Sequence, residues 1–431
     1  MAAGANSYLD RSKSTLTCER WDKDILIIGG GPGGLSTALH LAKFAPHLTP
    51  RILILEKERY PRPKLCAGGL TLDAERILEA LGLDVNEVPN VVAGEIRFDF
   101  GGKGLRVRAP KRHALRVVRR DEFDHWLAGK AGNRGIEIRE GVTVKRILPG
   151  EDSVTVETDK GRFTAAVVVG ADGSNGITRR CILPNDPVST ARVIEVLTPS
   201  RPSPHSTALE ETPEGQSGRE GIAFFDFFPV PNNIAGYVWD FPTRIKGTPM
   251  RCWGVYDTNL LADQKRPALK EPLAEEMQRR GFDLNDCEIK GYPIRWYAPG
   301  NKVSVPRVLL VGDAVGADAI FGEGISMALG YGIVAAREIA ESCQRNEFSF
   351  RGYRRRLGRS GLGQALFARW FISQVIYPLK WRWFQILLWR FLKPVVLLVA
   401  WSLVLNWSKK TPGIEPEEER KWLFTPPSNS R

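Results

Sequence analysis

A glycine-rich loop near the N-terminus could hold a ligand that carries phosphate groups. Gly29, Gly31 and Gly34 satisfy the pattern G-x-G-x-x-G. The first glycine permits a tight turn, the second lets backbone approach a pyrophosphate, and the third lets a helix pack against a strand. An apolar run at 24–28 precedes the loop and a helical pattern at 33–43 follows it, which is the context that makes the motif specific. The loop therefore predicts a dinucleotide site at a helix N-terminus; a glycine-rich loop without a ligand is the alternative.

Glu56 limits which dinucleotide could bind. It follows a second apolar run, 51–55, which completes a strand–helix–strand unit of the usual size. A carboxylate at this position can accept hydrogen bonds from both ribose hydroxyls, and it disfavours a 2′-phosphate. We therefore expect FAD or NAD here rather than NADP.

Two further motifs follow buried strands later in the chain. Asp172 and Gly173 come just after one apolar strand, and Gly312 and Asp313 come just after the run 307–311. Asp313 could bond a ribityl hydroxyl, and the dipole of the next helix could face the pyrimidine end of a flavin, where positive potential stabilises the anionic reduced form. Each motif alone could be an ordinary turn. The three together, in this order, are far more specific.

The order of these motifs resembles the FAD-binding fold of the glutathione reductase type, in its branch typified by p-hydroxybenzoate hydroxylase. In that branch the second and third motifs flank a substrate domain, as they do here. The segment 120–127 also resembles the helix of the branch that carries an arginine near the flavin diphosphate and ribityl chain. The resemblance implies that Arg120 contacts the cofactor; a surface arginine beside Arg119 is the alternative.

Three segments narrow the resemblance to the geranylgeranyl reductase family. Residues 61–70 resemble its PxxKxCxGG segment, 236–242 its YxWxFP motif, and 312–325 its GDAxG…GEGI pattern. The likeness covers about residues 24–343. It implies a FAD-dependent oxidoreductase that reduces isolated double bonds of a geranylgeranyl-type or other lipophilic substrate, by hydride transfer from reduced flavin.

The same resemblance assigns residues to the site. It adds Lys64 to the cofactor-binding set, and it places six residues close to the flavin: Cys66, Gly68, Gly69, Gly322, Glu323 and Gly324. It assigns the substrate to three aromatic residues: Tyr237, Trp239 and Phe241. Tyr237 and Trp239 alternate with Val238, so both rings project from the same face of a strand. Ordinary sheet core is the alternative for these rings, and an incidental thiol is the alternative for Cys66. The pattern indicates no general acid.

Other activities fit the same motifs. A FAD-dependent monooxygenase acting on an aromatic, quinone or isoprenoid substrate shares the cofactor pattern, and a non-catalytic prenyl-binding chaperone shares the fold. The retained Gly29, Glu56 and Asp313 argue against the chaperone. Because only one dinucleotide fingerprint is present, the electron donor is expected to be NAD(P)H bound transiently or a ferredoxin-like protein.

The positive charge of the chain is concentrated near its C-terminus. The formal net charge is +12, yet twelve basic residues and no Asp or Glu lie between Phe348 and Gly413, together with six of the twelve tryptophans. Cationic and aromatic residues together favour a membrane surface over a nucleic acid. We therefore expect peripheral membrane contact through 351–410 and no nucleic-acid partner. A helical cap on the substrate domain is the alternative; the longest charge-free run, 394–408, is short for a spanning helix.

The order of these patterns predicts an α/β protein, α+β overall, in which a discontinuous Rossmann-like FAD domain is interrupted by a mainly antiparallel sheet domain. The polar N-terminus and scattered cysteines favour a reducing, cytoplasmic location with peripheral membrane contact, and they favour no metal site. The oligomeric state is left open. The expected divisions are a flexible extension (1–20), the FAD domain (21–90, 111–185 and 295–347), the sheet domain (91–110 and 186–294), a basic helical segment (348–413) and a polar tail (414–431).

Overall fold

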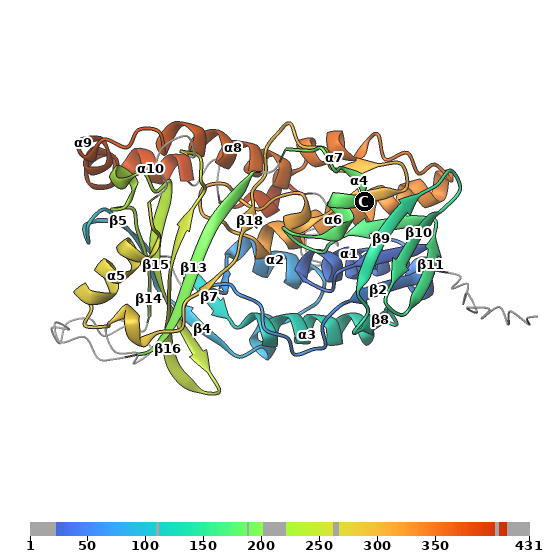
Figure 1. Cartoon of the computed structure of the whole chain (residues 1–431), viewed down its shortest axis with the longest axis horizontal. Helices are drawn as coiled ribbons and strands as arrows, with labels where there is room; N and C mark the ends of the chain where they lie inside the picture. The colour runs from blue at the N-terminus through green and yellow to red at the C-terminus, as the bar shows by residue number, and fades with distance from the viewer. Residues whose placement is uncertain are drawn as a thin grey trace, which may run out of the picture.

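A computed structural model describes residues 23–108, 112–187, 189–200, 221–261, 267–400 and 405–411. The extension and the polar tail predicted from the sequence lie outside these residues. Figure 1 shows one elongated molecule with a parallel sheet towards one end and a largely antiparallel sheet towards the other.

The nucleotide domain is built on a sheet with the strand order β19-β20-β12-β1-β2-β8. Every neighbouring pair from β20 to β8 is parallel, and β19 pairs antiparallel with β20. The strands are β1 (Ile25–Ile28), β2 (Ile52–Glu56), β8 (Glu137–Glu140), β12 (Val167–Gly170), β19 (Ser304–Val305) and β20 (Val308–Leu310). Strands β1, β2, β12 and β20 are buried throughout, as the continuous apolar runs predicted.

The two faces of this sheet are covered differently. Ile25 and Ile27 pack into a core shared with helices, whereas Leu26 and Ile28 pack against a second, three-stranded sheet. The helices are α1 (Pro32–Phe44), α2 (Leu72–Ala80), α3 (Arg120–Gly132) and α6 (Ile325–Arg345). The covering sheet consists of β9 (Val144–Pro149), β10 (Val154–Thr158) and β11 (Gly161–Ala165).

One expected strand is in fact two. The apolar stretch 163–169 suggests a single strand, but β11 ends at Ala165 and β12 begins at Val167, and the two belong to different sheets. The chain passes here from an antiparallel hairpin into the parallel sheet. Phe163 and Ala165 of β11 pack into the same core as Val168 of β12, so the apolar pattern continues across the break.

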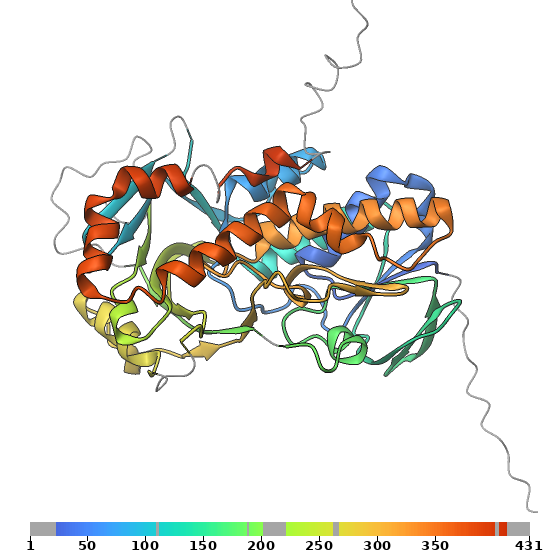
Figure 2. The same cartoon turned by 90° about the horizontal axis from the view of Figure 1, so that it is seen from above.

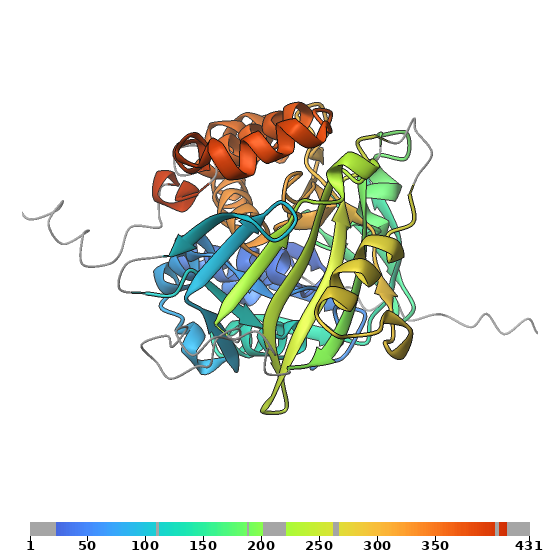
Figure 3. The same cartoon turned by 90° about the vertical axis from the view of Figure 1, so that its left-hand side faces the viewer.

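The second domain is a sheet with the order β17-β13-β16-β15-β14-β5-β6, in which β18 also pairs with β13. All pairs are antiparallel except β14 with β5. Figure 3 looks onto its outer face, where α5 (Lys270–Arg279) lies across it. The strands are β5 (Glu95–Asp99), β6 (Gly104–Arg108), β13 (Thr190–Pro199), β14 (Ile222–Asp226), β15 (Gly236–Ile245), β16 (Thr248–Asp257), β17 (Lys290–Gly291) and β18 (Ile294–Arg295).

These two sheets confirm the predicted fold class, a discontinuous nucleotide domain interrupted by a mainly antiparallel sheet. A small sheet, β3-β7-β4, lies between them in the chain path; its strands are β3 (Gly69–Leu70), β4 (Asn90–Ala93) and β7 (Leu115–Val118). The domain limits given above stay a prediction. Short helical turns complete these domains: η1 (Pro46–Arg51), η2 (Val85–Glu87), η3 (Val230–Asn232), α4 (Ile177–Ile182), η4 (Leu284–Asp286) and η5 (Gly312–Ala314).

The chain ends in a row of helices along one side of the molecule. Figures 1 and 2 show them running from the nucleotide domain to the far end of the second sheet. The row consists of α7 (Tyr353–Arg359), α8 (Gly361–Ile376), α9 (Arg382–Ile386), η6 (Leu387–Phe391) and α10 (Lys393–Val399). The short η8 (Trp407–Lys410) lies back against α2 and α8. Within the described ranges, none of the helices has the length and apolar character needed to span a bilayer.

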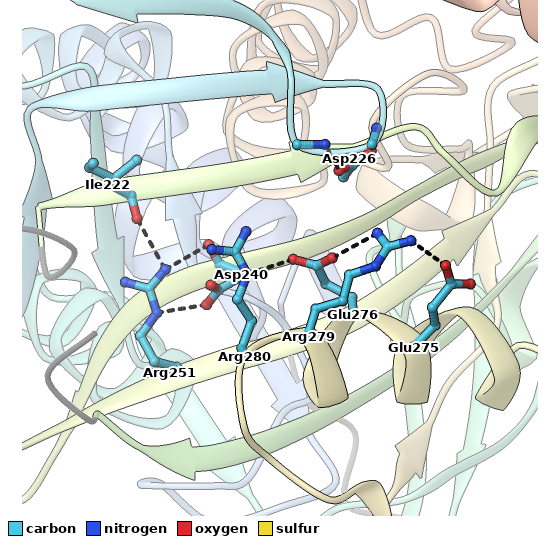
Figure 4. Close-up of polar contacts among 10 residues, drawn as sticks. Ile222, Asp226, Asp240, Arg251, Glu275, Glu276, Arg279 and Arg280 are labelled. Atoms are coloured by element: carbon cyan, nitrogen blue, oxygen red, sulfur yellow. Dashed lines mark hydrogen bonds and ion pairs between the residues drawn. The ribbon is translucent and has the colours of Figure 1, made fainter. Parts of the chain in front are cut away.

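The outer face of the second sheet carries charged groups that satisfy one another (Figure 4). The buried Arg251 donates to the Asp240 carboxylate at 2.6 Å and to the Ile222 carbonyl at 3.1 Å. On α5, Glu276 accepts from Arg280 at 2.9 Å. At the end of β14, the Asp226 carboxylate accepts the N–H groups of Gly101, Gly102 and Phe228. These charged groups therefore have partners within the protein.

Asp99 gives this network a pH dependence. Burial, with the Asp226 charge beside it, raises the pKa of Asp99 to about 6. The folded protein therefore takes up a proton near pH 6 that the unfolded chain takes up near pH 4, so this group adds stability as the pH falls between those values. We expect Asp99→Asn to raise the free energy of unfolding at pH 7 by about 1–2 kcal/mol, because the amide carries neither the cost of a buried charge nor the repulsion from Asp226. Urea unfolding at pH 7 and pH 5 measures it.

The control for this prediction is Asp152→Asn, at an exposed aspartate. It should leave the wild-type pH dependence unchanged, whereas Asp99→Asn should remove part of it. Parallel stability profiles for the wild type and Asp99→Asn would contradict the assignment.

Candidate flavin site

The carboxyl ends of the parallel strands bring the three sequence motifs together. Gly29 follows β1, Ala171 follows β12 and Gly312 follows β20. A Cβ on Gly29 would lie 2.4 Å from the Ala171 carbonyl oxygen, and one on Gly33 would lie 3.5 Å from the Gly312 Cα. Ligands of open α/β sheets bind at this edge, so the fold places all three motifs where a dinucleotide is expected.

The glycines of the first loop differ in what the protein itself requires of them. Gly29 has a φ of +105°, and a Cβ on Gly34 would lie 2.1 Å from the Gly29 carbonyl oxygen. Both positions therefore need glycine whether or not a ligand binds. Gly31 has an ordinary φ of −84°, and a Cβ there would have only Arg62 Nη2 within 4 Å, at 3.8 Å. The open space over Gly31 is a cradle of the kind a pyrophosphate needs.

Glu56 is held in place at the end of β2. Its carboxylate accepts the Gly30 N–H at 2.8 Å and the Glu58 N–H at 3.0 Å, and it lies 3.4 Å from Arg62. The Tyr60 hydroxyl donates to the Gly30 carbonyl. A carboxylate oriented by backbone N–H groups keeps lone pairs for a ribose diol, so the donor set fits the adenosine part of FAD.

Three cations surround the loop. Asp124 is fully buried and holds Arg120 through two hydrogen bonds of 2.8 and 2.9 Å, and it pairs with Arg62 at 3.2 Å. Lys64 is half-buried, and its ammonium lies 4.0 Å from the centroid of the Tyr292 ring. Within the described residues Lys64 forms no ion pair. In the part of the chain that the structure describes, the Nε of Arg62 also has no hydrogen-bond partner, so the protein leaves positive charge on both side chains incompletely matched.

Asp313 lies among these charges. Burial raises the pKa of Asp313, and the nearby Lys64 and Arg120 oppose the shift without cancelling it. A Cβ on Gly324 would lie 3.5 Å from the Asp313 carboxylate, so the third motif adjoins the GEG segment. Helix α6 starts at the next residue, Ile325, and its N-terminal dipole points into this region.

Asp172 has a structural partner. Its Oδ2 accepts the Thr178 N–H at 2.8 Å and the Thr178 hydroxyl at 3.0 Å, which holds the first turn of α4. Its Oδ1 is buried without a hydrogen-bond partner among the described residues, and burial raises the pKa of Asp172. Gly173, with a φ of +80°, lies near the Tyr292 hydroxyl. The turn interpretation therefore describes one oxygen of Asp172, and its contact with a cofactor stays a prediction.

The segment 66–69 runs between the two domains. Gly68 has a φ of +81°, and a Cβ there would lie 1.9 Å from the Val118 carbonyl oxygen, so no larger residue fits. Gly69 lies 3.6 Å from the Phe241 ring by the same measure. The Cys66 sulfur accepts the Gly68 N–H at 3.4 Å. These contacts place the segment beside the aromatic side chains of the second sheet, and it begins two residues after Lys64 in the chain.

The loop 318–324 is fixed from three elements. Tyrosine hydroxyls of β15, β16 and the end of α8 donate to its backbone carbonyls; they belong to Tyr237, Tyr256 and Tyr377. A Cβ on Gly322, which has a φ of +64°, would lie 2.6 Å from the Tyr256 ring. Three tyrosine hydroxyls therefore hold the loop, and glycine is needed at 322, where the backbone passes close to the ring of Tyr256.

Glu323 is ionised within this loop. Its carboxylate accepts from the hydroxyls of Thr71 and Ser326 and pairs with the buried Arg369 of α8, which also pairs with Asp318 at 3.1 Å. Burial alone would raise the pKa of Glu323, but Arg369 and the two hydroxyl donors lower it by more than burial raises it. The net shift of the pKa is therefore downward. Glu323 is therefore not a proton donor at neutral pH.

Tyr237, Trp239 and Phe241 share one face of β15, together with aromatic residues of neighbouring elements. The Phe225 ring lies 5.0 Å from both Tyr237 and Phe241, and 4.9 Å from Phe98. We call this surface the aromatic face of the sheet: Phe98, Phe225, Tyr237, Trp239, Phe241 and Phe321. It meets the loop 318–324 at Phe321 and the segment 66–69 at Gly69.

Comparison with known proteins now supplies the family. The family model for the FAD binding domain matches residues 22–317 of this chain. The chain belongs to this family of FAD-binding proteins. It is 29% identical over 344 residues to an uncharacterised protein of Methanosarcina barkeri (78% of this chain, 79% of the relative) and 26% identical over 360 residues to a digeranylgeranylglycerophospholipid reductase of Thermoplasma volcanium (76% and 80%).

The fold also matches a solved structure. The crystal structure of a geranylgeranyl bacteriochlorophyll reductase-like protein from Thermoplasma acidophilum superposes with a TM-score of 0.67 at 19% identity, covering 93% of this chain and 98% of the other. These findings confirm the resemblance stated from the motifs, and they confirm a flavoprotein of a family of FAD-dependent enzymes.

The sequence did not single out several residues of the site. Arg62 lies inside the segment 61–70, and its position two residues before Lys64 was a signal that could have found it. Tyr292 and Arg369 reach the site only through tertiary packing, and no local pattern marks either.

A substitution of Lys64 is expected to affect cofactor binding and the stability of the apoprotein differently. Burial lowers the pKa of Lys64 more than the Asp313 charge raises it, so its positive charge costs the ligand-free protein stability. We expect Lys64→Met to keep or raise the free energy of unfolding of the apoprotein while weakening FAD binding about tenfold, because a charge-assisted contact is lost. Flavin fluorescence titration and urea unfolding measure the two effects. Lys57→Met, at an exposed lysine, should change neither; unchanged FAD affinity in Lys64→Met would contradict the assignment.

Proposed function

We propose that this chain is a FAD-dependent reductase that saturates isolated double bonds of a geranylgeranyl-type lipid. The observation that carries the proposal is the aromatic face of the sheet, in which Tyr237, Trp239 and Phe241 are buried. This face contacts the segment 66–69 and the loop 318–324 of the flavin site. Relatives named digeranylgeranylglycerophospholipid reductases support the substrate class.

The residues of the site would divide the work as follows. The glycine loop, Glu56, Arg62, Lys64 and Arg120 would hold the dinucleotide, and Asp313 would hold the ribityl chain. FAD, when bound and reduced, supplies a hydride. The aromatic face would bind the apolar chain and exclude water from it.

The described side chains give no strong candidate for the proton donor. Glu323 has a lowered pKa, and burial raises the pKa of Tyr237 well above its usual value while its hydroxyl already donates to Phe321. We therefore propose that the second alkene carbon takes its proton from water. The electron donor is NAD(P)H or a ferredoxin-like protein, which anaerobic bleaching of the flavin by each donor distinguishes.

Product analysis tests the proposal. The purified protein with FAD and dithionite is incubated without oxygen with a geranylgeranylated glycerol lipid, and the product is examined by mass spectrometry. The proposal expects two added hydrogens for each double bond reduced. A substrate that gains an oxygen atom only when O₂ is supplied would replace the proposal by a monooxygenase, which the FAD domain also fits. A tightly bound lipid that is never altered would indicate a prenyl-binding chaperone.

A further inference from the structure

The outer face of the C-terminal helices gathers the exposed apolar side chains of the molecule. Among the described residues, every exposed large hydrophobic side chain except Leu148 lies between Phe367 and Leu405. Phe371 is 55% exposed and Phe391 is 71% exposed. Single exposed apolar residues are common, but a cluster on one segment marks an interaction surface.

The spacing on α8 shows that this exposure belongs to one side of the helix. Phe367, Phe371 and Val375 are exposed and stand four residues apart, so they line one stripe. Arg369 and Ser373 are buried on the other side. The helix therefore has one packed side and one exposed apolar side.

The packed side is fixed by specific contacts. Trp389 of η6 stacks on Phe227 at 4.2 Å between ring centroids, and Arg390 donates to the Phe100 carbonyl at 2.7 Å. Tyr377 and Arg369 hold the loop 318–324, as described above. Because these contacts fix the orientation of the helices, the exposed side chains face away from the core. The alternative suggested by the sequence, a helical cap on the substrate domain, therefore accounts for the inner side of these helices only.

The charge of the segment indicates what covers the outer side. There is no Asp or Glu between Phe348 and Gly413. Basic side chains are exposed on the same row of helices: Arg351 just before α7, Arg354, Arg355 and Arg359 of α7, and Arg382 of α9. Figures 1 and 3 place this row on one side of the molecule. Basic groups beside exposed aromatic and aliphatic side chains match a bilayer that contains anionic lipids.

We propose that α8, α9, η6 and α10 lie flat on an anionic lipid bilayer, with Phe367, Phe371, Trp383 and Phe391 inserted at the interface. Their inner side contacts the aromatic face of the sheet, since Trp389 stacks on Phe98 with rings 11° from parallel. A prenyl chain dissolved in the bilayer would thus reach the aromatic face by way of these helices. The docking itself does not depend on the reaction proposed above.

Vesicle flotation tests the docking with the full chain. Vesicles of phosphatidylcholine with phosphatidylglycerol should carry the protein upward in a density gradient, and vesicles of phosphatidylcholine alone should carry less. Phe371→Ser combined with Phe391→Ser should lower the partition coefficient at least about tenfold, because two large apolar side chains lose their insertion. Leu148→Ser is the matched control, since Leu148 is exposed on β9, far along the chain from this face; it should leave flotation unchanged.

Three results would overturn the proposal. They are a wild type that does not float with anionic vesicles, a double variant that floats equally well, and a wild-type dimer in solution that the double variant converts to a monomer. The last result would make a second copy the occupant of this face. Thermal unfolding of the double variant should match the wild type, since both side chains are exposed; a lowered midpoint would be a fourth contradicting result, because it would mean that these side chains pack within the protein. No readout needs turnover, so a failure of the reaction leaves this test intact.

Discussion

Replacing Arg369 by methionine is expected to lower the free energy of unfolding by about 3–5 kcal/mol, the usual cost of breaking a buried ion pair from one side. Arg369 is 1% exposed and bridges the carboxylates of Asp318 and Glu323. Methionine fills much of the volume but leaves both carboxylates buried without their cation. Urea unfolding at pH 7 measures the loss.

The sign of the pH dependence follows from Glu323. Its folded-state pKa is held below the unfolded value, so it contributes stability at neutral pH that is lost as the pH falls through that pKa. The wild-type advantage over Arg369→Met should therefore shrink on acidification, as the orphaned carboxylates of the variant take up protons. Arg359→Met, on the exposed side of α7, should cost less than about 0.5 kcal/mol. A loss below about 1 kcal/mol in Arg369→Met would contradict the buried bridge.

Replacing Gly31 by alanine is expected to weaken FAD binding about 100-fold, or roughly 2.7 kcal/mol, while leaving the apoprotein folded. The backbone at Gly31 is not strained for alanine, and only Arg62 Nη2 lies near the added methyl group. The methyl would occupy the space that a pyrophosphate needs for close approach to the backbone. Isothermal titration with FAD and thermal unfolding of the apoprotein measure the two properties.

Two further glycines give this experiment its controls. Gly94→Ala adds a methyl group into open space in an exposed turn, and FAD affinity should not change. Gly34→Ala places the methyl 2.1 Å from the Gly29 carbonyl oxygen, so the apoprotein itself should be destabilised. If Gly31→Ala binds FAD as tightly as the wild type, the cradle over Gly31 does not hold the cofactor.

The nucleotide domain could be predicted from sequence because its signals are local. Continuous apolar runs gave β1, β2 and β20, and the glycine loop gave the start of α1. The signal failed where tertiary structure decides: the run 163–169 does not show the change of sheet at Ala166. Helix α5 was not singled out, because Pro272 obscures its pattern, although proline near a helix start removes no hydrogen bond.

The candidate site was predicted less evenly. Motif spacing brought together Gly29, Glu56 and Asp313, since strand ends of one parallel sheet must meet at one edge. The ion pair between Glu323 and Arg369 could not be predicted from the sequence, because Arg369 lies 46 residues further along the chain and reaches Glu323 only through the packing of α8. From the sequence alone, the C-terminal segment could be interpreted either as a helical cap or as a membrane-binding surface, and the two interpretations looked mutually exclusive. The structure gives the helices an inner side that caps the sheet and an outer apolar side.

Anaerobic stopped-flow reoxidation tests the central claim most directly. The flavin of the purified protein is reduced with light and mixed, without oxygen, with a geranylgeranyl lipid in detergent, while its absorbance is recorded. Our account predicts that the lipid reoxidises the flavin in a phase whose rate rises with lipid concentration and saturates, and that the fully saturated lipid does not. A flavin that stays reduced with the geranylgeranyl lipid and reoxidises only with O₂ would contradict it.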